Sequence, residues 1–371
     1  MFQESVFQEM IISEGPMFIK GRFDKHFKND DYEIHFNTKT GLEVLKGKDG
    51  KDPFKTDLPL LIDVGIMGSC LNSCHFCYQG RVEEPHMTLK NFKSIIDQVK
   101  HHVNQVALGG RGDPNHHPQF KEIVEYSRNN GVIPNYTTSG INLTDEQIEI
   151  SKICGAVAVS DYRVPHTYDA IKRLMDAKIK KVNIHLIFSR PNYDRSIKIL
   201  HGYNPWKTIF LGGKKKYNKI QPGQKVVQSS NVDIDRLNAV VFLLFKPQGQ
   251  GKDKQELIPT KMQIESFAQL AFQPKAKFKI GMDSCLINHV LKYSEPSQLQ
   301  RMAIDTCESS RMSVYISPSM QLIPCSFADH PEWGVQITKK QDIDYIWNRS
   351  HKFKQFRRRL KKNPCSCPVG L

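Results

Sequence analysis

The chain has 371 residues, of which 39% are hydrophobic and 25% are charged, and its formal net charge is +15. This balance excludes a disordered or membrane-embedded protein, and the length predicts a large catalytic domain with a smaller unit beside it. The positive charge favours anionic partners, such as nucleic acid or an acidic peptide, without choosing among them.

Residues 1–57 are predicted to form a lead-in with a hairpin, because they mix charged residues with short apolar stretches such as Tyr32–Phe36. Acidic residues stand where a secretory signal needs basic ones, and no apolar run in the chain reaches membrane-spanning length. We therefore expect a cytoplasmic protein with no membrane partner. In that reducing compartment the nine cysteines are expected to be metal ligands or reactive thiols rather than disulfides.

From Leu58 onwards, short apolar runs alternate with segments of helical periodicity, which is the pattern of repeated βα units. Strands are predicted at Leu60–Ile66, Gln105–Leu108, Ile133–Tyr136, Ala156–Ser160, Lys181–Ile187 and Ala239–Phe245. Helices are predicted at Leu89–His101, Gln119–Asn129, Asp145–Cys154, Tyr168–Ala177 and Tyr193–His201. Six such units favour an α/β fold, a partial (β/α)6 barrel over residues 58–246, with the chemistry at the carboxyl ends of its strands.

Two regions depart from this alternation. Leu211–Asp233 is a long polar insertion of the kind that often forms a lid or a binding loop. Residues 247–371 are predicted to form a small cysteine-rich C-terminal extension, in which the candidate metal ligands are Cys285, Cys307, Cys325, Cys365 and Cys367. Cys154, at the end of a helical stretch, is expected to serve packing alone.

Three cysteines follow directly after the first predicted strand. Cys70, Cys74 and Cys77 have the spacing C-x3-C-x2-C. Thiolates suit iron–sulfur clusters and zinc, and three thiolates on four irons leave one iron open. An open iron can chelate an amine and a carboxylate, which reductive cleavage of S-adenosylmethionine requires. A zinc knuckle is the alternative, although it usually needs a fourth ligand close by and His75 is poorly placed for that role.

The cysteine loop, with Phe76 just before its last cysteine, resembles the radical S-adenosylmethionine (SAM) superfamily over roughly residues 58–245. The resemblance implies a catalytic [4Fe–4S] cluster on the three cysteines, with SAM at its open iron and Phe76 beside it.

The segment after the second strand looks like the Gly-Gly-Glu motif of the superfamily, which binds the amino group of SAM. Gly109 and Gly110 match the motif, whereas Arg111 stands in place of its acidic residue. The resemblance therefore leaves Asp113 to supply the carboxylate.

By the same resemblance, polar residues on the later strands contact the cofactor. Thr138 lies in a segment similar to Thr-Thr-Asn-Gly, and Ser160 and Arg163 follow the fourth strand. Asn183 and His185 alternate with apolar residues on the fifth strand, so both point to one face. They are cofactor or substrate contacts if that face is the barrel lumen, and a hydrogen-bonded core pair if it is not.

The segment from Cys307 to Cys325 resembles the SPASM and Twitch extensions, which hold auxiliary clusters in radical enzymes that modify peptides and proteins. Met320 stands where that pattern has a glycine. The small number of cysteines implies one auxiliary iron–sulfur cluster at most, closer to Twitch. Cys365 and Cys367 could complete its ligands with Cys307 and Cys325, or Cys285 could ligate while Cys365 or Cys367 stays free, or a free thiol could donate a hydrogen atom to a substrate radical. The alternative is that these are ordinary buried thiols.

The resemblance implies an enzyme that cleaves SAM to a 5′-deoxyadenosyl radical and abstracts a hydrogen from a peptide or protein substrate. A crosslink, an epimer or an oxidised side chain would result, with a flavodoxin- or ferredoxin-type electron donor as a further partner. Two alternatives stay open. One is radical modification of RNA or a nucleotide, which the basic runs Lys214–Lys219 and Arg357–Lys362 favour, and the other is a non-enzymatic, metal-bearing nucleic-acid-binding module.

Overall fold

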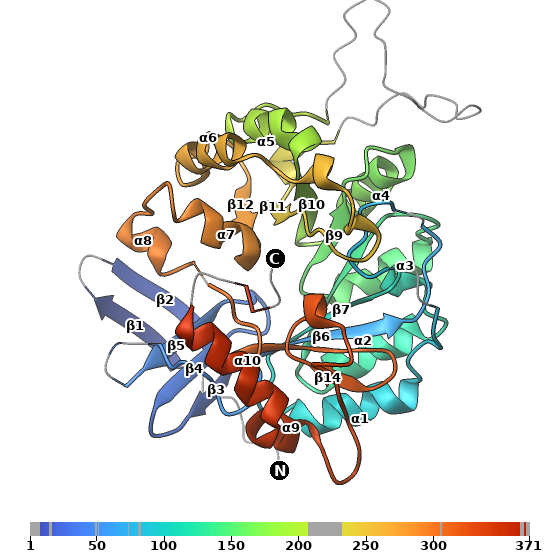
Figure 1. Ribbon diagram of the computed structural model, residues 1–371, viewed down its shortest axis with the longest axis vertical. Coiled ribbons are helices and arrows are strands. Elements are labelled where there is room, and N and C mark those ends of the chain that lie inside the picture. Colours follow the sequence, from blue (N-terminus) through green and yellow to red (C-terminus); the bar gives the residue numbers. More distant parts are fainter. Residues whose placement is uncertain are drawn as a thin grey trace, which may run out of the picture.

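A computed structural model describes most of the chain, as an open parallel sheet with helices along one side and two small antiparallel sheets at the N-terminus (Figure 1). The described residues are 8–14, 17–48, 50, 52–72, 74–80, 83–206, 232–304, 306–363 and 367–368, and side chains are described from residue 23 onwards except that of Leu299. Cys365 and nearly all of the predicted insertion Leu211–Asp233 lie outside these residues.

The six predicted strands are present and lie next to one another in chain order, each parallel to the next. They are β6 (Leu61–Met67), β7 (Gln105–Gly110), β8 (Ile133–Thr138), β9 (Val157–Ser160), β10 (Val182–Phe188) and β11 (Ala239–Leu244). Fully buried residues such as Ile62 and Val64 alternate with half-buried ones such as Asp63. The predicted partial barrel is therefore confirmed.

The helices connect successive strands on the outer side of this arc (Figure 1). They are α1 (Leu89–Val99), α2 (Phe120–Asn129), α3 (Asp145–Ile150), α4 (Pro165–Asp176), α5 (Tyr193–Leu200) and α6 (Lys261–Ala271). Each has an apolar stripe that packs on the sheet; in α1, Phe92, Ile95 and Ile96 are fully buried. Thr88 caps α1 by accepting a hydrogen bond from the backbone N–H of Asn91.

Two further parallel strands extend the sheet beyond the predicted six. β12 (Lys279–Met282) pairs with β11, and β13 (Ser313–Ile316) pairs with β6 at the opposite edge. β14 (Gln321–Ile323) and β15 (Val335–Gln336) continue from β13 as antiparallel strands. Because this sheet takes strands from both sides of residue 246, the division of the chain at residues 57 and 246 stays a prediction.

The remaining helices belong to the C-terminal part of the chain. They are α7 (Ser284–Val290), α8 (Gln298–Arg301), α9 (Ile343–Arg349) and α10 (His351–Lys362). Trp347 of α9 and Phe353 of α10 are fully buried, so both helices pack on the body of the protein. None of the helices in the described ranges is both long and apolar enough to cross a bilayer.

The N-terminal residues form a hairpin and a three-stranded antiparallel sheet. The hairpin consists of β1 (Gln8–Glu14) and β2 (Met17–Phe23), and the sheet of β3 (Lys25–Lys28), β4 (Tyr32–Phe36) and β5 (Glu43–Gly47). Tyr32 and Ile34 pack against Leu60 and Met312. This contact attaches the three-stranded sheet to the main sheet near β6 and β13.

Candidate functional site

Residues 68–80, here called the cysteine loop, follow β6 at its carboxyl end. Cys70 is exposed, and Cys74 and Cys77 are half-buried. The backbone N–H of Cys77 donates to the carbonyl of Cys74 (3.1 Å), and that of Asn72 donates to Cys70 Sγ (3.3 Å). Burial, and then the neighbouring Cys77 and Cys70, raise the pKa of Cys74 to about 11. A thiol with a raised pKa is protonated in the metal-free protein. It becomes a thiolate when a metal binds, because the cation compensates the buried negative charge.

Glycines bring the segment after β7 into close contact with the cysteine loop. Gly110 has a φ of +111°, and a Cβ there would lie 2.8 Å from Gly65 Cα. A Cβ on Gly112 would lie 2.2 Å from the carbonyl oxygen of Ser69. A Cβ on Gly109, by contrast, would meet nothing within 4 Å. The donor set of three thiols beside this open, glycine-lined space fits a cluster that binds a small molecule.

A second loop, which follows β11, contacts the backbone of the cysteine loop. The backbone N–H of Gln250 donates to the carbonyl of Cys77 (2.8 Å). Gly249 has a φ of +54°, and a Cβ there would lie 2.4 Å from the carbonyl oxygen of Tyr78. Sequence reasoning missed this contact, although a glycine in the loop that follows a barrel strand is the signal that marks it.

Replacing Gly249 by alanine is therefore expected to displace the cysteine loop and to lower the iron that the protein retains after anaerobic reconstitution. Gly131→Ala is the matched control, because Gly131 also has a positive φ (+74°) but a Cβ there meets nothing within 4 Å. Both substitutions cost about 1 kcal/mol of backbone strain. Equal iron contents in the two variants would show that the contact with Cys77 is unimportant.

Asp113 is held next to the cysteine loop by neighbouring donors. Its Oδ2 accepts hydrogen bonds from the backbone N–H of Ser139 (2.8 Å), Ser139 Oγ (2.5 Å) and Thr138 Oγ1 (3.2 Å). The carboxylate is close enough to raise the pKa of both Cys70 and Cys74 in addition to the effect of burial. Asp113 is thus positioned to bind a cation beside the loop, and Thr138 orients it.

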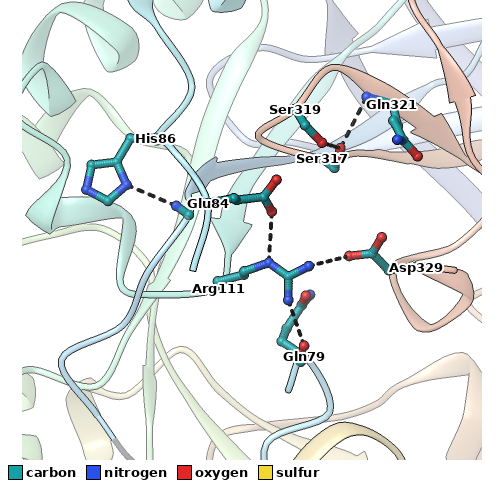
Figure 2. A network of polar contacts seen from close by, with 9 residues as sticks. Gln79, Glu84, His86, Arg111, Ser317, Ser319, Gln321 and Asp329 are labelled. Atoms are coloured by element: carbon teal, nitrogen blue, oxygen red, sulfur yellow. Dashed lines mark hydrogen bonds and ion pairs between the residues drawn. The ribbon is translucent and has the colours of Figure 1, made fainter. Parts of the chain in front are cut away.

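Arg111 joins three segments through its guanidinium (Figure 2). Its Nε donates to Glu84 Oε1 (2.8 Å), its Nη1 to the carbonyl of Gln79 (2.7 Å), and its Nη2 to Asp329 Oδ2 (3.3 Å). The side chains of Arg111 and Glu84 are 12% and 17% exposed. The arginine that replaces the acidic residue of the motif therefore ties the cysteine loop to the C-terminal part of the chain.

Replacing Arg111 by methionine is expected to lower the free energy of unfolding by about 2–4 kcal/mol, because two poorly exposed carboxylates lose their partner. Arg173→Met removes a comparable pair with Asp145, whose side chain is 98% exposed, and is expected to cost less than about 1 kcal/mol. Urea unfolding of the two variants measures the difference. Similar losses in both would mean that the Arg111 network contributes no more than a surface pair.

Ser160, at the end of β9, and Asn183 and His185, on β10, lie at half-buried positions of the sheet. Ser160 is directly opposite His185 in the β9–β10 register. Asn183 Oδ1 accepts a hydrogen bond from Asn238 Nδ2 (2.7 Å), and burial lowers the pKa of His185 to about 4, so this imidazole is neutral. Arg163 is exposed and has a φ of +60°. Their contacts with a cofactor stay a prediction.

Phe76 lies beside Tyr162, a residue that sequence reasoning missed. The centroids of the two rings are 5.5 Å apart, and a hydrogen bond from Tyr162 lowers the pKa of Cys74, opposing the effect of burial. Tyr162 stands between Ser160 and Arg163, so the segment was recognised but this side chain was not.

The candidate ligands of the C-terminal extension line one cavity of about 130 Å³. The described cysteines around this cysteine cavity are Cys285, Cys307, Cys325 and Cys367. Burial raises the pKa of the Cys325 thiol to about 12, with further contributions from Cys307 and Cys367, and it also raises that of Cys285. Four thiols around one cavity match the donor set of an iron–sulfur cluster.

Cys285 reaches the cysteine cavity from α7. Asp283 caps this helix by accepting from the backbone N–H of Leu286 (2.8 Å), and it also forms an ion pair with Lys246 after β11. The ammonium of Lys246 lies 4.6 Å from the ring centroid of Phe327 and counteracts the rise in the pKa of Cys285. The barrel strands thus fix the position of this cysteine.

Asp63, a further residue that sequence reasoning missed, lines the same cavity from the middle of β6. Burial raises its pKa to about 6. An aspartate within the apolar run LLIDVGIM was the available signal. β6 therefore carries the cysteine loop at its end and an acidic group of the cysteine cavity at its middle.

Replacing Asp63 by asparagine is expected to stabilise the cluster-free protein by about 2 kcal/mol at neutral pH and to change little near pH 4. Its pKa in the fold lies above that of an unfolded chain, so ionisation disfavours the folded state. As far as Asp63 is concerned, the free energy of unfolding of the wild type is thus highest below about pH 4, falls as the pH rises to about 6, and is constant above that. Urea unfolding across this range measures the effect, and a substitution that acts equally at all pH values would contradict it.

Known proteins resemble this chain over most of its length. A family with the description "Radical SAM superfamily" matches residues 64–209 of this chain. The mycofactocin maturase MftC of Mycolicibacterium smegmatis is 22% identical over 324 residues, which are 84% of this chain and 75% of that protein. MftC of Mycobacterium tuberculosis is 22% identical over 319 residues, 84% of this chain and 76% of that protein.

Solved structures share the fold. SuiB of Streptococcus suis, bound to its precursor peptide SuiA, superposes with a TM-score of 0.60 at 14% identity, covering 82% of this chain and 67% of SuiB. SuiB bound to S-adenosylmethionine gives a TM-score of 0.59 at 14% identity, covering 81% of this chain and 68% of SuiB. With the cysteine loop at the end of the first barrel strand and the match over residues 64–209, this part of the chain is a radical SAM domain, and the chain is an enzyme.

Proposed function

We propose that this radical SAM enzyme modifies a peptide, using a [4Fe–4S] cluster on Cys70, Cys74 and Cys77 and an auxiliary cluster in the cysteine cavity. The proposal rests on one observation. Four cysteines line one cavity beside β6, the strand that ends at the cysteine loop. When bound, the cluster of the loop supplies one electron for the reductive cleavage of SAM, which the superfamily uses to start radical chemistry.

The residues of this chain hold and orient the reactants around that chemistry. Asp113 offers a fixed carboxylate to the ammonium group of SAM, a role that Arg111 cannot take because its guanidinium is itself a cation. The open space at Gly109 admits the backbone of the methionine part. Asp63 lines the same cavity as the four cysteines, so its carboxylate is the candidate acceptor for a proton that is released beside the auxiliary cluster.

The relatives support a peptide as the substrate. MftC is a mycofactocin maturase by name, and SuiB was solved with a precursor peptide bound. The sequence matches extend over 84% of this chain, so they include most of the C-terminal extension as well as the barrel. A peptide-modifying radical enzyme is therefore the function that the fold, the donor sets and the relatives support together.

The contacts of the C-terminal basic run weaken the RNA alternative. Arg357 is buried and donates to the carbonyls of Ser310 and Trp347. Arg359 stacks on Trp333 and pairs with Glu332 at 3.6 Å. These two arginines serve packing, and the run Lys214–Lys219 lies outside the described residues.

Anaerobic reconstitution followed by incubation with SAM, reductant and a candidate substrate tests the proposal. A short precursor peptide encoded beside the gene is the first substrate to try. We expect 5′-deoxyadenosine together with a peptide of altered mass. Product from an RNA panel but none from peptides would replace the peptide proposal with the RNA one.

A further inference from the structure

A third group of metal-binding side chains lies on the N-terminal three-stranded sheet and shares no residue with the cysteine loop or the cysteine cavity. It consists of His26 on β3 and Glu33 and His35 on β4. His26 is directly opposite His35 in the antiparallel register. Because side chains alternate along a strand, Glu33 lies on the same face as His35. All three side chains therefore project from one face of the sheet.

The three side chains are close enough to share one ion. One ligand atom of each lies within 4.8 Å of those of the other two. The two imidazole rings are stacked, with centroids 4.5 Å apart and planes 26° apart. Zinc bonds of about 2.0–2.2 Å hold ligand atoms roughly 3.3 Å from one another. His26 is exposed and Glu33 is half-buried, so both side chains have room to rotate toward a shared ion.

His35 has an unused ring nitrogen directed at this group. Its side chain is 4% exposed, and among the described residues its Nε2 has no hydrogen-bond partner; the nearest carboxylate oxygen, Glu33 Oε2, is 3.7 Å away. A buried polar atom without a partner is costly, and a metal ion would satisfy it. The ring of Phe23 packs edge-on against His35 with centroids 5.5 Å apart and limits its rotation.

Two ammonium groups face the site and oppose a cation. Lys28 Nζ lies 3.8 Å from Glu33 Oε2, and Lys46 Nζ lies 3.7 Å from Glu33 Oε1. Their side chains are 68% and 49% exposed, so both can turn into solvent when an ion takes the carboxylate. Burial, and then His26, lower the pKa of His35, which keeps this imidazole neutral and able to bind a metal.

We propose that His26, Glu33 and His35 bind a divalent transition-metal ion, zinc or ferrous iron, through two imidazoles and one carboxylate. This donor set is typical of both ions and leaves coordination positions for water. Magnesium and calcium prefer sites made only of oxygen ligands and are not expected to bind. A metal here links β3 to β4 across the pair of histidines and stabilises the N-terminal sheet.

Metal titration of the reconstituted protein tests the proposal, because iron and sulfide then occupy the cysteines. Zinc, ferrous iron and magnesium are dialysed separately against wild type, His26→Gln and Glu33→Gln, and bound metal is counted by mass spectrometry. We expect one zinc or ferrous ion per chain beyond the clusters, bound at least about tenfold more weakly in both variants.

The controls separate this site from adventitious binding. His101→Gln removes an exposed histidine elsewhere and should leave binding unchanged, whereas Lys46→Gln should tighten it because one opposing ammonium is gone. His35 is kept intact because it is packed within the sheet. The proposal is overturned if wild type, His26→Gln and Glu33→Gln bind zinc and ferrous iron equally well, or if wild type binds magnesium as tightly as these ions. Neither result affects the proposed function.

Discussion

Replacing Cys74 by alanine is expected to abolish 5′-deoxyadenosine formation under strong reductant. Two remaining thiolates cannot hold a four-iron cluster with one open iron, so the iron content should fall by about four per chain. Iron, sulfide and 5′-deoxyadenosine are measured on the same anaerobic preparation. The effect is the largest that we predict, because no other described group stands in for this ligand.

Cys154→Ala is the matched control for that experiment. Cys154 is a partly buried thiol packed against the hydrophobic core, and burial raises its pKa to about 12, so it is unreactive. Its replacement costs stability but should leave iron content and SAM cleavage unchanged. If Cys74→Ala cleaved SAM as fast as Cys154→Ala, the cysteine loop would not be the site of the active cluster.

Replacing Cys325 by alanine is expected to separate SAM cleavage from substrate conversion. The cysteine cavity should lose its two or four irons per chain, since four cysteines can hold either type of cluster, while the cluster of the cysteine loop stays intact. SAM would then still be cleaved under reductant, but the modified peptide should fall at least tenfold if the auxiliary cluster accepts an electron or anchors the substrate. Full product formation by Cys325→Ala would remove the auxiliary cluster from the mechanism.

A comparison of Cys285→Ala with Cys365→Ala identifies the fourth ligand of the cysteine cavity. The structure places Cys285 beside Cys307, Cys325 and Cys367, so iron should be lost in Cys285→Ala and retained in Cys365→Ala. The reverse result would assign the site to the two cysteines of the tail and leave Cys285 as a free thiol.

Much of the fold follows from the sequence because the barrel strands and helices obey local rules. The six predicted strands were recognisable as apolar runs between amphipathic helices, and the start of α3 at Asp145 is a local feature too, since Thr144 and Gln147 form a capping box there. β12 and β13 were missed because they have four residues each, and the first of them, KIGM, has neither alternation nor a continuous apolar run. Their pairing with β11 and β6 depends on contacts between distant parts of the chain.

The candidate site was predictable where a motif is contiguous and not where it is assembled in space. Cys70, Cys74 and Cys77 were evident from their spacing. The ion pairs of Arg111 with Glu84 and Asp329 could not be predicted, because one partner precedes Arg111 and the other follows it, and both are distant in the sequence. Nor does any spacing rule place Asp63 next to Cys285 and Cys325. Such contacts arise only when the C-terminal strands complete the sheet.

The pairing of β6 with β13 has a consequence for synthesis on the ribosome. β6 emerges early and finds β7 soon afterwards, but its other edge stays unpaired until residue 313 has been translated. An unpaired apolar edge of this kind is prone to associate with other chains. We expect the nascent chain to depend on chaperones during this interval, and fragments that stop before β13 to aggregate rather than accumulate as folded barrels.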